Sequence, residues 1–130
     1  QNGAEVVFVP SCPETMKGAN RVHIGARARA LENQIYTVVS QTVGNAEWSQ
    51  AVDLNSGFAA VYATPDLGFS EDGVIATGNI NQEEILICEL DLNLIKNVRR
   101  NGAVLNYKHH QNLLNELQNP FKIELIDLEI

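Results

Sequence analysis

The sequence predicts a mixed α/β fold. Two apolar runs rich in β-branched residues, at residues 6–9 and 35–39, have the composition of strands that are covered on both faces. Between them, residues 15–34 favour a helix, and several alanines there supply small side chains for close packing. A strand, a helix and a second strand in this order indicate a unit that combines both kinds of element.

The first strand ends at a proline-bounded break, residues 10–13, which contains Cys12. A nucleophilic cysteine needs an activating base within hydrogen-bond reach, and no residue at a fixed spacing from Cys12 supplies one. The residues alone therefore favour a small buried side chain at a strand end. They leave open a separate enzyme that pairs Cys12 with His23, which lies on the following helix.

The middle of the chain predicts a loop followed by two antiparallel strands. Residues 41–56 are polar and contain the single tryptophan, so we expect a loop there. Proline and glycine turn signals lie between the apolar runs at residues 58–63 and 74–77. These two runs are expected to pair with each other.

The last third of the chain predicts a strand, two helices and a final strand. Residues 83–90 are apolar enough for a strand, and Asp91 is a suitable N-cap for a helix that extends to residue 100. A short helix is expected at residues 109–117. Residues 121–130 alternate like a strand whose apolar side changes partway, which requires a bulge or a partner on each side.

Composition and charge exclude several classes of protein. A chain of 130 residues fits one domain, and a net charge of −7 with a pI near 4.8 argues against binding to nucleic acid. No apolar run is long enough to cross a bilayer. Cys12 and Cys88 match no zinc-binding spacing, and His109 and His110 would point apart on a helix, so we expect no metal and no cofactor. Cys88 is expected in the core, and reduced thiols indicate a cytoplasmic protein.

Four ordered segments resemble the C-terminal half of the carbon-nitrogen hydrolase (nitrilase) superfamily. They read GAEVVFVPSCPET, RVHIGARARALENQIYTVVSQTVG, WSQAVDLNSGFAAVYATPDLGFSEDGVIATGNIN and ILICELDLNLIKNVRRNGAVLNY. The most specific parts are the Ala-Arg-Ala-Leu-Glu-Asn run at residues 28–33 and the closing strand and helix at residues 85–100. The resemblance assigns residues 1–110 to the C-terminal portion of the hydrolase domain. Residues 111–130 are then a tail that we expect to pack across a dimer.

The resemblance implies a four-layer α-β-β-α sandwich and a hydrolase of amide or nitrile bonds. Members of the family use a glutamate, a lysine and a cysteine: the thiolate attacks the carbon, the carboxylate moves protons and the ammonium stabilises the oxyanion. All three are expected upstream of the Gly-Ala-Glu at residues 3–5, so none can be assigned to this chain. The chain by itself is expected to be inactive, whereas its parent protein is expected to be an enzyme of the amidase type.

The resemblance also implies roles for five residues and a partner. Ser11 and Cys12 are candidates for the wall of a pocket that binds a small amide or nitrile, and a helix-starting or core role is the alternative. The helix at residues 20–34 is expected to pack on its counterpart in a homodimer. A different class of function is also open, in which the chain is an inactive binding or assembly module. Three further residues look structural, holding the helix against the following strand: Arg29, Glu32 and Asn33.

Overall fold

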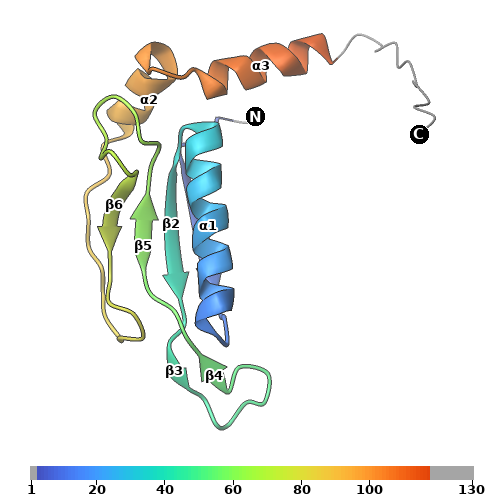
Figure 1. Ribbon diagram of the computed structural model, residues 1–130, viewed down its shortest axis with the longest axis vertical. Helices are drawn as coiled ribbons and strands as arrows, with labels where there is room; N and C mark the ends of the chain where they lie inside the picture. Colours follow the sequence, from blue (N-terminus) through green and yellow to red (C-terminus); the bar gives the residue numbers. More distant parts are fainter. Residues whose placement is uncertain (1–2, 118–130) are drawn as a thin grey trace, which may run out of the picture.

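The computed structural model describes residues 3–117 (Figure 1). One sheet of four strands carries a long helix on one face, and two shorter helices follow at one end of the sheet. This arrangement confirms the mixed α/β class, with a helix layer on a sheet layer as in half of an α-β-β-α sandwich. The elements are β1 (Val6–Ser11), α1 (Met16–Asn33), β2 (Tyr36–Gln41), β3 (Gly44–Asn45), β4 (Leu54–Asn55), β5 (Ala60–Tyr62), β6 (Val74–Thr77), α2 (Leu92–Asn101) and α3 (Asn106–Glu116).

The sheet has the strand order β1-β2-β5-β6. β1 and β2 are parallel, and their register runs from the pair Val6 and Tyr36 to the pair Ser11 and Gln41. β5 is antiparallel to β2, and β6 is antiparallel to β5 with a register shift in the middle. Both parallel strands therefore end at the same edge of the sheet, beside the start of β5.

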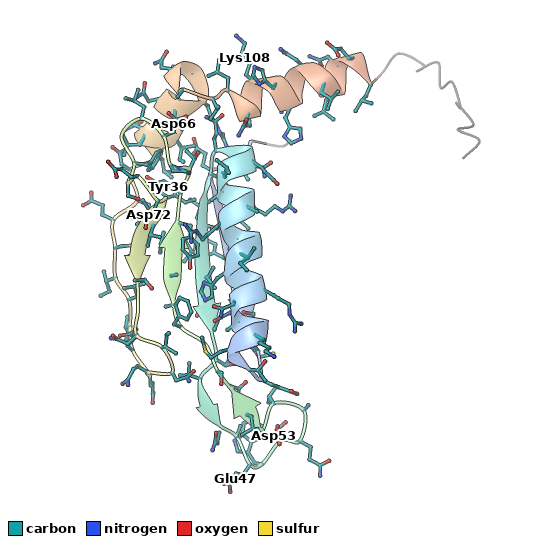
Figure 2. The ribbon with its side chains drawn as sticks, in the orientation of Figure 1. Tyr36, Glu47, Asp53, Asp66, Asp72 and Lys108 are labelled. Atoms are coloured by element: carbon teal, nitrogen blue, oxygen red, sulfur yellow. The ribbon has the colours of Figure 1, made fainter. Side chains whose placement is uncertain are left out.

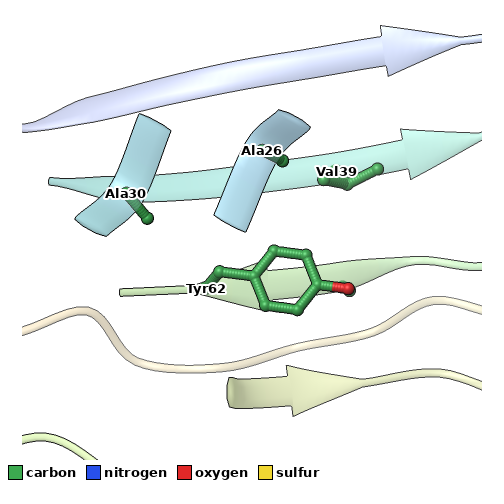
Figure 3. Close-up of a cluster of buried hydrophobic side chains, with 5 residues drawn as sticks. Ala26, Ala30, Val39 and Tyr62 are labelled. Atoms are coloured by element: carbon green, nitrogen blue, oxygen red, sulfur yellow. The ribbon is translucent and has the colours of Figure 1, made fainter. Parts of the chain in front are cut away.

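The helix α1 packs on the sheet through small side chains. Thr15 caps its first turn by accepting a hydrogen bond from the Gly18 amide at 3.3 Å. Its buried residues follow helical spacing and include Ala26 and Ala30, which face Val39 and Tyr62 across the interface (Figure 3). Alanine side chains let the helix axis approach the strands closely, so the expected close packing is confirmed.

The opposite face of the sheet is only partly covered. At one end, Tyr36 and Val61 pack with Ile95 from α2 in a second buried cluster. Further along, Phe8 on β1 is 74% exposed. The prediction that this strand is covered on both faces is therefore wrong for the described part of the chain, because α1 lies on one face only.

The segment at residues 83–90 does not form the expected strand. It lies between β6 and α2 without a ladder partner among the described residues. A strand requires a hydrogen-bonding neighbour, and the apolar composition of this segment does not supply one. Ile85 and Ile87 are 88% and 87% exposed, and Cys88 is also exposed rather than in the core.

Two polar side chains join α1 to the helices at the far end. Gln34 ends α1 in the left-handed conformation (φ 49°), and its buried amide donates to the carbonyls of Val98 and Val104 and accepts from the Tyr107 amide. Arg99 on α2 donates to the Gln34 carbonyl at 3.1 Å and stacks on the Tyr107 ring at 4.0 Å. The end of α1 is thus tied to the end of α2 and the start of α3.

Asp66, which is labelled in Figure 2, joins the turn after β5 to the connection between α2 and α3. Its carboxylate accepts hydrogen bonds from the amides of Leu67, Ala103 and Val104. Burial raises the pKa of this carboxyl, but the backbone hydrogen bonds, led by the one from Ala103, lower it more, so the pKa falls below its ordinary value. The turn and the helix connection therefore hold a charged carboxylate at neutral pH.

The helices α2 and α3 begin and end close to the predicted positions. Asp91 caps α2 by accepting a hydrogen bond from the Asn93 amide at 2.8 Å, as expected. α3 starts three residues earlier than predicted, where the Asn106 side chain donates to the Leu31 carbonyl of α1. The boundary expected after residue 110 falls within α3, and the division into domain and tail stays a prediction. The strand expected at residues 121–130 lies outside the described residues.

Candidate functional site

An open cavity lies where β1 and β2 end. It has a volume of about 400 Å³, and we call it the strand-end cavity. A smaller hollow of about 160 Å³ adjoins it, walled by residues that include Ser40, Gln41, Phe58 and Glu84. The two share the end of β2 as a common wall. The strand-end cavity is lined by Pro10, Ser11, Cys12, Ser40, Gln41 and Thr42.

Both residues that the resemblance assigned to a pocket wall line this cavity. The Cys12 side chain is exposed, so it is not the buried side chain that the residues alone favoured. The Ser11 hydroxyl oxygen is buried and has no hydrogen-bond partner within residues 3–117. The role of Ser11 and Cys12 in binding a substrate stays a prediction. The exposed Cys12 side chain is accessible to a molecule in the cavity.

His23 is not placed to activate Cys12. It is buried on α1, and each ring nitrogen already has a partner: Nε2 lies 3.0 Å from the Gln41 side-chain oxygen, and Nδ1 lies 2.8 Å from the Tyr62 hydroxyl. Neither nitrogen is left for a thiol. The structure therefore does not bring Cys12 and His23 together as a nucleophile and its base.

Gln41 is a polar centre that the sequence analysis missed. Its side-chain oxygen accepts from His23 and from the Phe58 amide at 3.2 Å, and its side-chain nitrogen donates to the Ala19 carbonyl at 3.3 Å. The partners come from α1 and from the segment that leads into β5. A glutamine at the end of a β-branched strand is the signal that could have indicated a polar contact at this strand end.

Burial sets the protonation of this polar network. Desolvation lowers the pKa of His23 below its ordinary value, against the smaller opposing effects of the hydrogen bonds with Gln41 and the Phe58 backbone. Burial also raises the pKa of Tyr62, against the opposing charge of Arg27, whose guanidinium lies 5.7 Å from the centre of that ring. His23 is therefore neutral and Tyr62 protonated at neutral pH.

The three residues expected to be structural lie at the opposite end of α1 from the strand-end cavity. Arg29 and Glu32 form an ion pair at 2.6 Å, with side chains 68% and 48% exposed. The Asn33 side chain donates to the Arg29 carbonyl at 3.0 Å, and its own carbonyl lies 3.5 Å from Arg99. These contacts stabilise the last turns of α1, and of the three residues Asn33 is the one with a hydrogen bond to a neighbouring element, α2, among the described residues.

Within residues 3–117, no group of three or more His, Cys, Asp or Glu side chains is arranged to hold a metal ion. In the same residues, no helix has both the length and the apolar character needed to cross a membrane.

The chain belongs to the carbon-nitrogen hydrolase family. The family model described as carbon-nitrogen hydrolase matches residues 1–100, which include β1, α1, the whole sheet and most of α2. The chain is also 36% identical over 116 residues to the probable hydrolase YhcX of Bacillus subtilis (strain 168). That match covers 89% of this chain and 23% of the relative, so the chain spans less than a quarter of the relative's length.

Proposed function

We propose that these residues are the C-terminal portion of a hydrolase that cleaves a carbon–nitrogen bond of a small amide or nitrile through a cysteine acyl-enzyme. The observation that carries the proposal is the family match across residues 1–100, which includes the strand-end cavity. The catalytic glutamate, lysine and cysteine belong to residues outside this chain. This chain supplies part of the wall that holds the substrate.

The geometry of the strand-end cavity fits that role. Its walls combine the exposed Cys12 thiol, the buried Ser11 hydroxyl and the side chain of Ser40. An open cavity with a few polar groups at one end of a sheet suits a small polar substrate that reacts with groups from another part of the protein. Water must reach the acyl-enzyme to release the product, and the open side of the cavity permits this.

The uncovered face of the sheet supports the proposal that the chain works as part of a larger fold. Phe8, Ile85 and Ile87 are largely exposed, although each is strongly apolar. Exposed apolar side chains in this number indicate a surface that another layer covers. The same observation favours the alternative, an inactive assembly module that pairs with another chain.

We also propose a cytoplasmic homodimer in which α1 packs on its counterpart. Ile24 and Leu31 are exposed on α1 and would be covered by such a contact. Sedimentation of the full-length protein should give the mass of a dimer. A monomer at micromolar concentration would contradict this part of the proposal.

The proposed function is tested with substitutions of Cys12 in the full-length protein. Cys12→Ala should keep kcat for a small amide within a few-fold of the wild type, because Cys12 is not the nucleophile. Cys12→Leu should disfavour longer amides in a series from acetamide to hexanamide, since the added methyl groups reduce the cavity. Cys88→Ala is the matched control, because Cys88 is exposed and lies outside the cavity wall. Loss of all turnover in Cys12→Ala, with normal folding, would contradict the proposed role.

A further inference from the structure

We propose that Gln41 is a positioning residue for the substrate pocket. Its side-chain amide, oriented by His23, fixes the gap between the end of β2 and the segment that leads into β5. This gap sets the shape of the strand-end cavity and therefore the affinity for the substrate. The inference rests on the proposed function, since it concerns the same cavity.

One amide group connects three separate parts of the chain. The Gln41 oxygen accepts from His23 on α1 at 3.0 Å and from the Phe58 amide at 3.2 Å, and the Gln41 nitrogen donates to the Ala19 carbonyl at 3.3 Å. Each partner lies at least 17 positions away in the sequence. The amide therefore holds the end of β2 against α1 and against the segment before β5.

Gly57 lies close against the Gln41 side chain. A Cβ atom added to Gly57 would lie 2.5 Å from both the Cβ and the side-chain oxygen of Gln41. The His23 ring stacks on the Phe58 ring with centres 3.8 Å apart and planes 11° apart. Gly57 is thus the residue type that the close approach requires, and Phe58 is held by the His23 ring and by its amide hydrogen bond to Gln41.

The hydrogen-bond partners determine the tautomer of His23. The Ala19 carbonyl can only accept and the Phe58 amide can only donate, so the Gln41 side-chain oxygen must face His23. His23 Nε2 then carries the proton and donates to Gln41, and Nδ1 accepts from the Tyr62 hydroxyl at 2.8 Å. The donors and acceptors form a directed chain from Tyr62 through His23 to Gln41.

The position of Gln41 affects the cavity wall because β2 is paired with β1. Gln41 is the register partner of Ser11, and the next amide, that of Thr42, donates to the Ser11 carbonyl at 3.0 Å. Cys12 follows directly and lines the same cavity. A change in the Gln41 side chain therefore moves the strand end that carries Ser11 and Cys12.

The decisive variant is Gln41→Glu in the full-length protein. A protonated carboxyl can reproduce the amide, because one oxygen accepts from His23 and Phe58 and the other donates its proton to the Ala19 carbonyl. An ionised carboxylate can only accept, so it is repelled by that carbonyl and leaves it without a donor. The KM for a small amide should therefore rise as the pH increases through the ionisation of the new carboxyl.

We expect a rise of about tenfold in KM, the equivalent of one unsatisfied buried polar group, with a smaller change in kcat. Six ionisable side chains lie near the introduced group. They are His23, which contacts it directly, Tyr62 on the far side of His23, Arg27 over the Tyr62 ring, Cys12 in the strand-end cavity, and Glu83 and Glu84 in the adjoining hollow. All six are unchanged in Gln41→Glu. Gln50→Glu is the matched control, because it adds the same charge at an exposed position in the β3–β4 loop. A loss of folding would lower the active fraction but would not give a KM that depends on pH.

A second variant tests the same chain from its other end. Tyr62→Phe keeps the ring but removes the hydroxyl that donates to His23 Nδ1, so the proton of His23 is free to move from Nε2 to Nδ1. We expect KM to rise by a few-fold with kcat nearly unchanged. If Gln41→Glu does not fold, the KM of Tyr62→Phe tests the positioning role of Gln41. Unchanged KM in Tyr62→Phe, or a KM in Gln41→Glu that follows the pH dependence of the wild type, would overturn the inference.

The experiment separates this inference from the proposed function. If the wild-type protein hydrolyses neither amides nor nitriles, the proposed function is wrong. The positioning role is then read from alkylation of Cys12 by iodoacetamide, followed on the Cys12 peptide by mass spectrometry. The rate ratio between Gln41→Glu and Gln50→Glu should change several-fold with pH. A ratio that stays constant would overturn the positioning role.

Discussion

Replacement of Arg99 by lysine tests how the far end of the fold is held together. The guanidinium donates to the carbonyls of Gln34 and Ala4 at 3.1 and 2.6 Å and stacks on the Tyr107 ring at 4.0 Å. A lysine keeps the charge but can make only one of these contacts at a time, because its ammonium is a point charge rather than a planar fork. One lost hydrogen bond is worth about 1 kcal/mol, and the lost stacking about 0.5–1 kcal/mol. Arg99→Lys should therefore destabilise the protein by about 2 kcal/mol.

Urea unfolding of the full-length protein, followed by tryptophan fluorescence and circular dichroism, measures this loss. Arg100→Lys is the matched control, because Arg100 is the next residue on α2 and its side chain is exposed. We expect the control to lie within about 0.5 kcal/mol of the wild type. Equal stability of the two variants would refute the conclusion that Arg99 joins the segment before β1, the end of α1 and the start of α3.

Three further predictions concern stability. Gly57→Ala should cost about 1–3 kcal/mol, because its Cβ would overlap Gln41; unchanged thermal stability would contradict this. The pKa of His23 is lower in the folded protein than in the unfolded chain, so the unfolded chain takes up the proton at a higher pH than the folded protein does. The free energy of unfolding should therefore be constant above pH 6.5 and fall as the pH drops from 6.5 through the folded-state pKa. Unfolding curves of His23→Gln should lack this dependence. Arg29→Ala should change the free energy of unfolding by less than about 0.5 kcal/mol, because the pair with Glu32 is exposed. A loss of stability several times larger would contradict this.

Local signals in the sequence were enough to predict most elements. The proline break near the end of β1 and the N-cap Asp91 before α2 act within a few residues, so a single sequence contains the information. The turn signals between β5 and β6 likewise predicted their antiparallel pairing. By contrast, residues 83–90 have strand composition but no partner among the described residues, and pairing is a property of the fold rather than of the segment.

The polar connections could not be predicted because they join distant residues. Gln34 binds carbonyls more than 60 positions away, and the His23 ring links Gln41 to Tyr62. Nothing in the spacing of these residues distinguishes a buried hydrogen-bonded side chain from an exposed one. For the candidate site, the resemblance pointed to Ser11 and Cys12, which line a cavity, and their role toward a substrate stays a prediction. It did not point to Gln41, whose hydrogen bonds form only once α1 is packed on the sheet.

The most direct test of the proposed function is to locate the acyl-enzyme. The full-length protein is incubated with a slowly hydrolysed amide or nitrile, quenched with acid and digested, and the modified peptide is identified by mass spectrometry. We expect an acyl adduct on a cysteine upstream of Gly3, with the Cys12 peptide unmodified and with the same adduct in Cys12→Ala. An adduct on Cys12, or turnover with no cysteine adduct at all, would contradict it.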